Sequence, residues 1–273
     1  MVLSEEEFNR RKASYDKLCC EVNTAYQELQ NENEANSKEK IYLKSFPDCK
    51  EINLWTYWQG YHAMAPNILV IGQDFGCPFG GSFGNITDYQ KVIQDTEQDG
   101  GLHYFDVFGD KKKSATDENL AELFRSLGRG YDDLIGQRYD DLFFTNICLG
   151  YRNIGNSGGF KKSWITYIEK AAYPKLLGIL KPKVIICLGQ NAYDYFLDVM
   201  GIVDLRNRSN FNQFIEDNCK NPFKLGNSFV FAVAHCGVMG TLNRNRAKRR
   251  GNEKIKNNLD IQVEDWSYIK QYL

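Results

Sequence analysis

The stretch Asn67-Ile68-Leu69-Val70-Ile71-Gly72-Gln73-Asp74 decides the fold class of this chain. Four consecutive apolar residues are typical of a strand that is buried on both faces, as in a parallel sheet. The run ends in a glycine and two polar side chains, Gln73 and Asp74. Open α/β sheets bind their ligands at the carboxyl ends of such strands. The stretch therefore predicts a sheet strand that leads directly into a functional site.

Further apolar runs predict three more strands, at residues 142–147, 184–189 and 229–234. Apolar residues at helical spacing predict helices at residues 4–32, 116–127, 164–180, 191–199, 245–258 and 266–273. Residues 201–226 lack such a pattern and are expected to be irregular. The alternation predicts a three-layer α/β/α sandwich around a central, mostly parallel, four-stranded sheet. We expect residues 46–273 to form this single domain, with residues 1–45 as an N-terminal helix and linker packed on it.

The composition is that of a globular protein, with 42% hydrophobic residues, 25% charged residues and a net charge of −1 over 273 residues. The eight cysteines show no Cys-x-x-Cys pair, so neither a metal site nor a disulfide framework is expected. Residues 5–7 are acidic where a signal peptide would be basic, and no apolar run could span a membrane. A reducing, cytoplasmic location is the expectation.

Three of the predicted strands end in polar side chains of complementary chemistry. Asp74, Asn146 and His235 follow the first, second and fourth strands, whose carboxyl ends should share one edge of the sheet. A carboxylate can orient or deprotonate a water, and a histidine can donate to charge that develops on an oxygen. The asparagine amide offers both donors and an acceptor, which suits the edge of a nucleobase. These three side chains are therefore predicted to form one site.

A basic stretch follows His235 and is unusual in a chain that is nearly neutral overall. Between residues 238 and 256 the only acidic residue is Glu253. The basic residues there are Arg244, Arg246, Lys248, Arg249, Arg250, Lys254 and Lys256. Such a local excess favours contact with phosphates, although a solvated helix face would have the same composition.

In these motifs the chain resembles the uracil-DNA glycosylase superfamily. The resemblance runs from about residue 67 to residue 250 and rests on the order and spacing of short motifs. These are Gly72-Gln73-Asp74-Phe75-Gly76, Cys77-Pro78-Phe79-Gly80-Gly81, Phe144-Thr145-Asn146-Ile147 with Tyr151-Arg152-Asn153, the strand Lys181–Gly189, and Ala234-His235. The resemblance implies a glycosylase-like sandwich fold and a monofunctional DNA-repair hydrolase. Such an enzyme acts in base excision repair, on DNA that contains uracil or a related deaminated base.

The resemblance also implies roles for the two catalytic candidates. Asp74 would position or activate the water that attacks the sugar C1′ atom. His235 would stabilise negative charge on the uracil O2 atom as the N-glycosidic bond breaks. Enzymes of this kind flip the target nucleotide out of the duplex into a tight pocket.

Base and DNA contacts are implied in the same way. Backbone groups of Gln73 and Phe75, together with the Asn146 side chain, would read the flipped base, and Phe79 would stack on it, with Phe83 as the substitute if the loop runs differently. Met239 would be an apolar wedge that fills the gap in the DNA. Phosphates would be held by Arg244, Arg246, Lys248, Arg249 and Arg250.

The sequence departs from the superfamily pattern at the residues that follow both catalytic motifs. Phe75-Gly76 replaces the Pro-Tyr of the best-known branch, and Cys236-Gly237 replaces Pro-Ser. The four-cysteine pattern of the iron–sulfur branch is missing, so no cluster and no other cofactor is expected. Two hypotheses follow: an active glycosylase, or a glycosylase-fold module that binds nucleic acid or nucleotides with little or no such activity.

Overall fold

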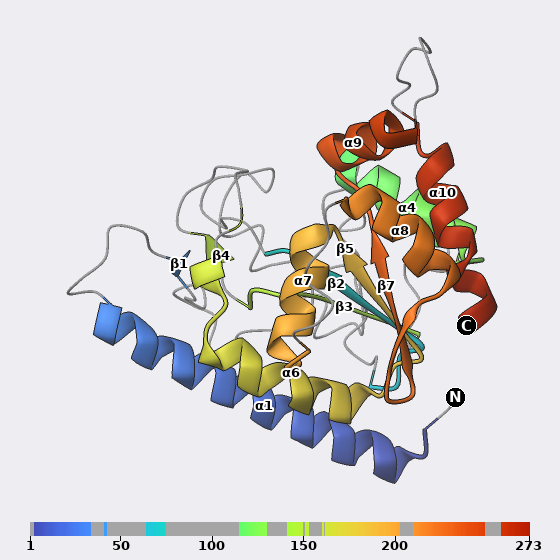
Figure 1. The fold of residues 1–273 in the computed structure, drawn as a ribbon. Coiled ribbons are helices and arrows are strands. Elements are labelled where there is room, and N and C mark those ends of the chain that lie inside the picture. The colour runs from blue at the N-terminus through green and yellow to red at the C-terminus, as the bar shows by residue number, and fades with distance from the viewer. Residues whose placement is uncertain are drawn as a thin grey trace, which may run out of the picture.

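The structure is a computed structural model that describes residues 3–33, 41–42, 64–74, 115–129, 141–149, 151–152, 160, 162–202, 210–248 and 258–273. It is an α/β structure built on a mostly parallel, five-stranded sheet (Figure 1). The strand order is β3–β2–β5–β7–β6. The strands span Ile68–Gly72 (β2), Leu142–Asn146 (β3), Val184–Leu188 (β5), Phe223–Leu225 (β6) and Ser228–Val233 (β7).

The four predicted strands are confirmed, and they pair in parallel along β3–β2–β5–β7. The prediction of a four-stranded sheet is wrong, because β6 pairs antiparallel with β7 through a tight hairpin that turns at Gly226. The prediction of irregular structure at residues 201–226 is also wrong, since this region holds β6 and helix α8, Phe211–Lys220. The Asn210 side chain caps α8 by accepting from two backbone N–H groups. This N-cap residue lies in a polar stretch, where it was not recognised as the start of a helix.

Strand β6 pairs only with the first half of β7, and beside the second half a side chain occupies the edge of the sheet. Asn218 on α8 accepts from the Ala232 N–H at 2.6 Å and donates to the Val230 carbonyl at 3.3 Å. The amide thus imitates a neighbouring strand and satisfies backbone groups that β6 is too short to reach.

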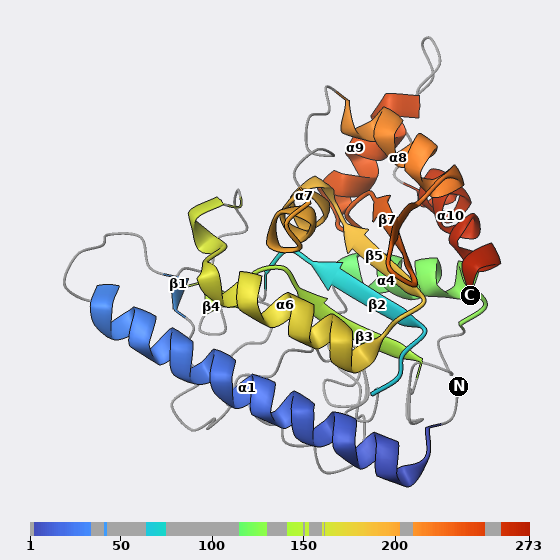
Figure 2. The ribbon, with the colours of Figure 1, turned by 60° about the horizontal axis from the view of Figure 1, so that its bottom comes forward.

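Helices cover both faces of the sheet (Figures 1 and 2). On one face, α1 (Glu5–Asn33), α6 (Tyr167–Leu180) and α7 (Gln190–Val199) pack on alternate strand residues such as Leu69 and Ile71. On the other face, α4 (Ala115–Ser126), α8 and α10 (Asp260–Ser267) pack on Ile68 and Val70. Strands buried on both sides explain the continuous apolar runs of the sequence.

The long N-terminal helix lies antiparallel to α6, as Figure 2 shows. At one end, the buried Arg11 donates to the carbonyl of Leu180 at 3.3 Å, and at the other end, Tyr26 donates to Glu169. Glu169 also completes the capping box of α6, where it accepts from the N–H of the N-cap residue Thr166 at 2.8 Å. None of the described helices combines the length and the apolar character needed to cross a membrane.

The closing helices lie in other places than the sequence pattern indicated. Helix α9 spans Val238–Lys248 and so begins before the predicted start at residue 245, while residues 249–257 lie outside the described residues. Helix α10 precedes a short 3-10 helix, Ile269–Tyr272. The pattern was misleading because α9 faces its neighbours with polar side chains, so the helical spacing of apolar residues is absent. A short strand pair, β1 (Ile41–Tyr42) with β4 (Tyr151–Arg152), and a 3-10 helix, Lys162–Trp164, complete the described elements.

Candidate functional site

The carboxyl ends of the parallel strands are joined by direct contacts. Asn146 at the end of β3 pairs with Gly72 at the end of β2. Between the ends of β2 and β5, the Asn191 amide donates to the Gln73 side chain at 3.0 Å. From β2 the chain runs to the edge strand β3, and from β3 it crosses back over β2 to β5. The connections that leave the carboxyl ends of β2 and β5 therefore run in opposite directions along the sheet. This topological switch point is where open α/β sheets bind ligands.

Asn146 is the most informative side chain at this edge, because it is 6% exposed and holds an amide. Its backbone carbonyl accepts from the Tyr173 hydroxyl at 2.6 Å, which fixes the end of the strand. Across the part of the chain that the structure describes, no protein group forms a hydrogen bond with its side-chain amide. A polar group that protein atoms leave unsatisfied can be satisfied by a ligand or by water. The Asn146 amide is therefore available to a polar ligand at this edge of the sheet.

Gly72 makes room for this amide. A Cβ atom at position 72 would lie 2.2 Å from Asn146 Oδ1, well inside van der Waals contact. Gly72→Ala is therefore expected to turn the Asn146 side chain away while lowering the free energy of unfolding by only about 1–3 kcal/mol. The Asn146 side-chain amide signals in a ¹H–¹⁵N NMR spectrum should move strongly. Gly178→Ala, where an added Cβ meets nothing within 4 Å, is the control and should leave them in place.

Asp74 and Gln73 follow β2 and are both half-buried. The Gln73 amide donates to Asp74 Oδ2 at 3.1 Å. The backbone carbonyl of Gln73 accepts from the Cys148 N–H at 3.1 Å, which ties the residue to the segment after β3. The Asp74 carboxylate is thus held at the carboxyl edge of the sheet, two residues after Gly72, which pairs with Asn146.

His235 follows β7, and its side chain is oriented by a local hydrogen bond. The Gly237 N–H donates to His235 Nδ1 at 2.9 Å, which places the proton of the neutral ring on Nε2. The ring surface is accessible, yet surrounding protein atoms displace enough water to lower the pKa of His235, against the opposing attraction of Asp74. His235 is therefore neutral at neutral pH and carries a donor on Nε2.

Three helices hold the backbone at His235. The Asn119 amide on α4 donates to the carbonyl of Cys236 at 2.7 Å, and the Gln262 amide on α10 donates to that of His235 at 3.3 Å. Gln262 is itself fixed by the Thr241 hydroxyl at 2.7 Å. A Cβ atom at Gly240 would lie 2.1 Å from the His235 carbonyl oxygen, so only glycine allows α9 to begin this close.

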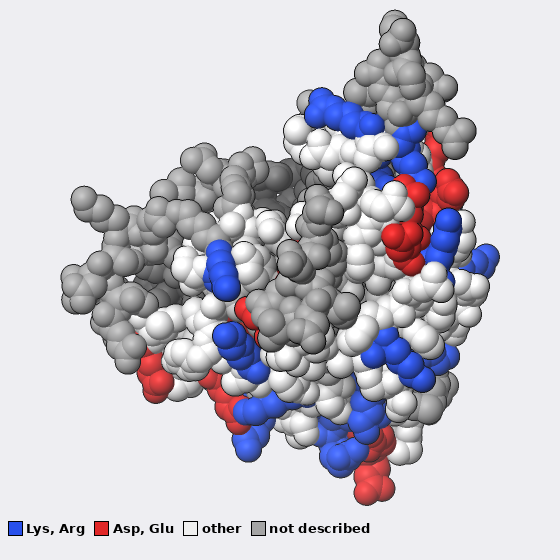
Figure 3. All heavy atoms as spheres, viewed as in Figure 1, with Lys and Arg blue, Asp and Glu red and all other residues white. Residues whose placement is uncertain are grey.

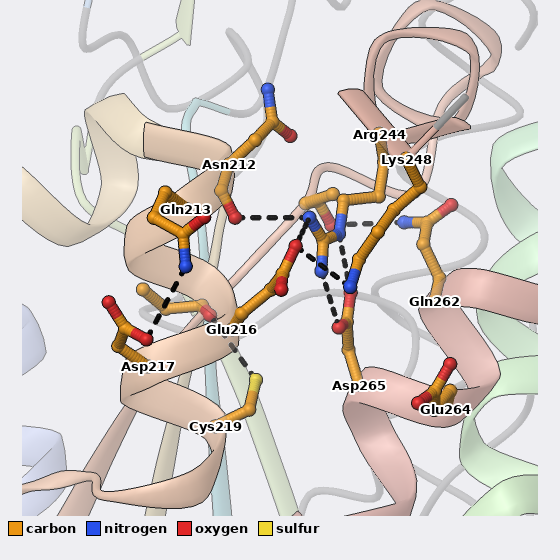
Figure 4. Close-up of polar contacts among 12 residues, drawn as sticks. Asn212, Gln213, Glu216, Asp217, Cys219, Arg244, Lys248, Gln262, Glu264 and Asp265 are labelled. Atoms are coloured by element: carbon orange, nitrogen blue, oxygen red, sulfur yellow. Dashed lines mark hydrogen bonds and ion pairs between the residues drawn. The ribbon is translucent and has the colours of Figure 1, made fainter. Parts of the chain in front are cut away.

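Arg244 does not face a phosphate, which corrects the interpretation of the basic stretch. Its side chain is fully buried and forms two 2.7 Å hydrogen bonds with the Asp265 carboxylate (Figure 4). A third nitrogen, Nη1, donates to the Asn212 carbonyl at 3.0 Å. The guanidinium ties α9 to α8 and α10, because a buried cation is stable only when charge and hydrogen bonds compensate it.

The other described members of the stretch differ in their surroundings. Arg246 is exposed, whereas Lys248 forms an ion pair with Glu216 at 2.8 Å. On the face shown in Figure 3, basic side chains over α9 adjoin acidic side chains over α8 and α10. Met239, in the first turn of α9, is 62% exposed and so is available to an external partner.

The remaining predicted site residues lie outside the described residues: Phe75, Phe79, Arg249 and Arg250. Within the described ranges, no three or more His, Cys, Asp or Glu side chains are grouped so as to hold a metal ion.

Sequence reasoning missed two residues of the site, Asn191 and Gln262. Asn191 follows the Leu-Gly end of the third strand, so the rule that found the other strand ends could have found it. Gln262 gives no such signal, because its role depends on the packing of α10 against the loop after β7. Comparison with models of known protein families gives no match, and comparison with curated proteins gives none either.

Proposed function

We propose that the protein is a DNA-repair glycosylase with a uracil-DNA glycosylase-like fold. It hydrolyses the N-glycosidic bond of uracil, or of a related deaminated base, in DNA. The observation that carries the proposal is the buried Asn146 amide, which has no described protein partner and stands on the same sheet edge as Asp74 and His235. An amide of this kind can pair with the donor and acceptor groups of a flipped base.

The reaction needs a nucleophile and a way to stabilise the leaving base. Asp74 orients a water toward C1′ and takes up its proton as the new C–O bond forms. His235 donates from Nε2 to the base oxygen on which charge develops as the C1′–N bond breaks. A neutral histidine suits this role, since the Gly237 N–H occupies Nδ1 and leaves the proton on Nε2. Arg246 and Met239, both exposed, support contact with the DNA.

An oligonucleotide that contains one uracil tests the proposal directly. After incubation with the protein, single- and double-stranded substrates are treated with alkali, which cleaves the strand wherever a base has been lost. We expect cleavage by the wild type and a loss of at least about a hundredfold in Asp74→Asn, because the amide cannot take up a proton. His235→Ala should lose about ten- to a hundredfold.

Asp217→Asn on α8 is the matched control, since it removes an exposed carboxylate that accepts a hydrogen bond from Gln213 of the same helix. It should cleave like the wild type. Absence of cleavage with uracil, hypoxanthine and mismatch substrates would refute the enzymatic proposal. If salt-sensitive DNA binding remained in that case, the module hypothesis would stand instead.

A further inference from the structure

The switch point between β2 and β5 is bridged by a chain of side-chain hydrogen bonds that ends on Asp74. Asn191 Nδ2 donates to Gln73 Oε1 at 3.0 Å, and Gln73 Nε2 donates to Asp74 Oδ2 at 3.1 Å. Asn191 comes from α7 and the other two residues from the end of β2. The chain therefore links two neighbouring strand ends through one carboxamide, that of Gln73.

A carboxamide has one donor end and one acceptor end, so its neighbours decide which way it points. The donor of Asn191 occupies the oxygen of Gln73 and thereby turns the Gln73 NH₂ group toward Asp74. The reversed amide would set its oxygen against the carboxylate and would bring two NH₂ groups together. His235 also acts on Asp74 electrostatically, since the two attract each other when the ring is protonated.

Asn191 is held rigidly enough to impose this choice. It is the second residue of α7 and lies two residues after Gly189, whose N–H donates to the Val233 carbonyl at 2.8 Å. The next two residues, Ala192 and Tyr193, are completely buried in the core. The backbone at Asn191 is thus fixed by β7 on one side and by core packing on the other.

We propose that Asn191 is a positioning residue, which orients the Gln73 amide so that it donates to the Asp74 carboxylate. The inference rests on the proposed function for the chemical role of Asp74, but the orientation of Gln73 can be measured without it. In this arrangement the Gln73 side chain contacts Asp74, and the flipped base is contacted by the Asn146 side chain and by backbone groups.

Asn191→Asp is the decisive variant because it keeps the shape and removes the donor. The new carboxylate attracts the Gln73 NH₂ group, so the amide should reverse and present its oxygen to Asp74. We expect the Gln73 side-chain NH₂ signals in a ¹H–¹⁵N NMR spectrum to move strongly, because the group turns from the Asp74 carboxylate to the new one. At neutral pH, kcat should fall with little change in KM, because the Asp74 carboxylate loses the donor that orients it.

Two comparisons separate this effect from the added charge. Gln190→Glu adds a carboxylate one residue away on an exposed side chain and should move the Gln73 NH₂ signals and lower kcat much less. In a Gln73→Ala background, Asn191→Asp should lower kcat no more than Gln190→Glu does. An equal movement of the Gln73 signals in Gln190→Glu, or an undiminished loss of kcat in the Gln73→Ala background, would overturn the inference. If the wild type cleaves no substrate, the proposed function fails, and the Gln73 NH₂ signals alone still decide the role of Asn191.

Discussion

Replacing Arg244 with alanine is expected to lower the free energy of unfolding by about 3–5 kcal/mol. The guanidinium is fully buried, and its two 2.7 Å hydrogen bonds are with Asp265, which is 5% exposed. Without Arg244, the Asp265 carboxylate loses both of its guanidinium hydrogen bonds and keeps only the partly exposed Lys248 as a nearby positive charge, and this poorly compensated burial dominates the loss. Urea unfolding followed by circular dichroism measures the change.

Arg246→Ala on the same helix is the matched control, since that side chain is exposed and should change the stability by less than about 0.5 kcal/mol. The double substitution Arg244→Met with Asp265→Leu should recover most of the loss, because it removes both charges together. If Arg244→Ala were as mild as Arg246→Ala, the buried ion pair would not be what holds α9 to α10.

The second large effect is a dependence of stability on pH that comes from Glu169. Burial raises the pKa of Glu169 from 4.5 to about 7, although backbone N–H groups of Thr166 and Leu149 donate to it and oppose the shift. Between these values the folded protein binds more protons than the unfolded chain. The stability from this group is therefore complete below about pH 4.5 and is lost as the pH rises through 7, by about 1.4 kcal/mol per unit at most.

Glu169→Gln removes the titrating carboxyl group, so the difference in stability between the wild type and this variant isolates its contribution. Below pH 5 the variant should be less stable than the wild type by about 1–3 kcal/mol, because the new NH₂ group faces a backbone donor. This difference in the free energy of unfolding should disappear as the pH rises to 8, where the wild type carries a buried charge. Urea unfolding at several pH values tests this, with Glu6→Gln as the control on an exposed carboxylate. A gap that stayed constant with pH would contradict the raised pKa.

Glu169 also connects the N-terminal helix with the candidate site. It accepts from Tyr26 of α1 and from the Leu149 N–H at 3.2 Å, three residues after Asn146. One turn further along α6, Tyr173 donates to the Asn146 carbonyl. Helix α1 thus supports the element that fixes the end of β3, a role that its amphipathic sequence alone did not indicate.

The parallel strands and the polar residues at their carboxyl ends could be predicted from the sequence because both depend on local pattern. Strands that are buried on both faces need continuous apolar residues, and Asp74, Asn146 and His235 are recognisable as the polar residues at which those runs end. The fifth strand could not be predicted in this way, since β6 has only three residues and none of them is fully buried.

The sequence by itself determined the parallel strands, their order along the chain and the polar side chains at their ends. Only the tertiary structure decided what each polar side chain touches. Arg244 and Arg246 are identical in type and two residues apart, yet one is buried on Asp265 and the other faces solvent, because helical geometry directs them to opposite sides. Likewise, Asn191 reaches Gln73 because β5 lies beside β2 in the sheet, a neighbourhood that distant segments create on folding.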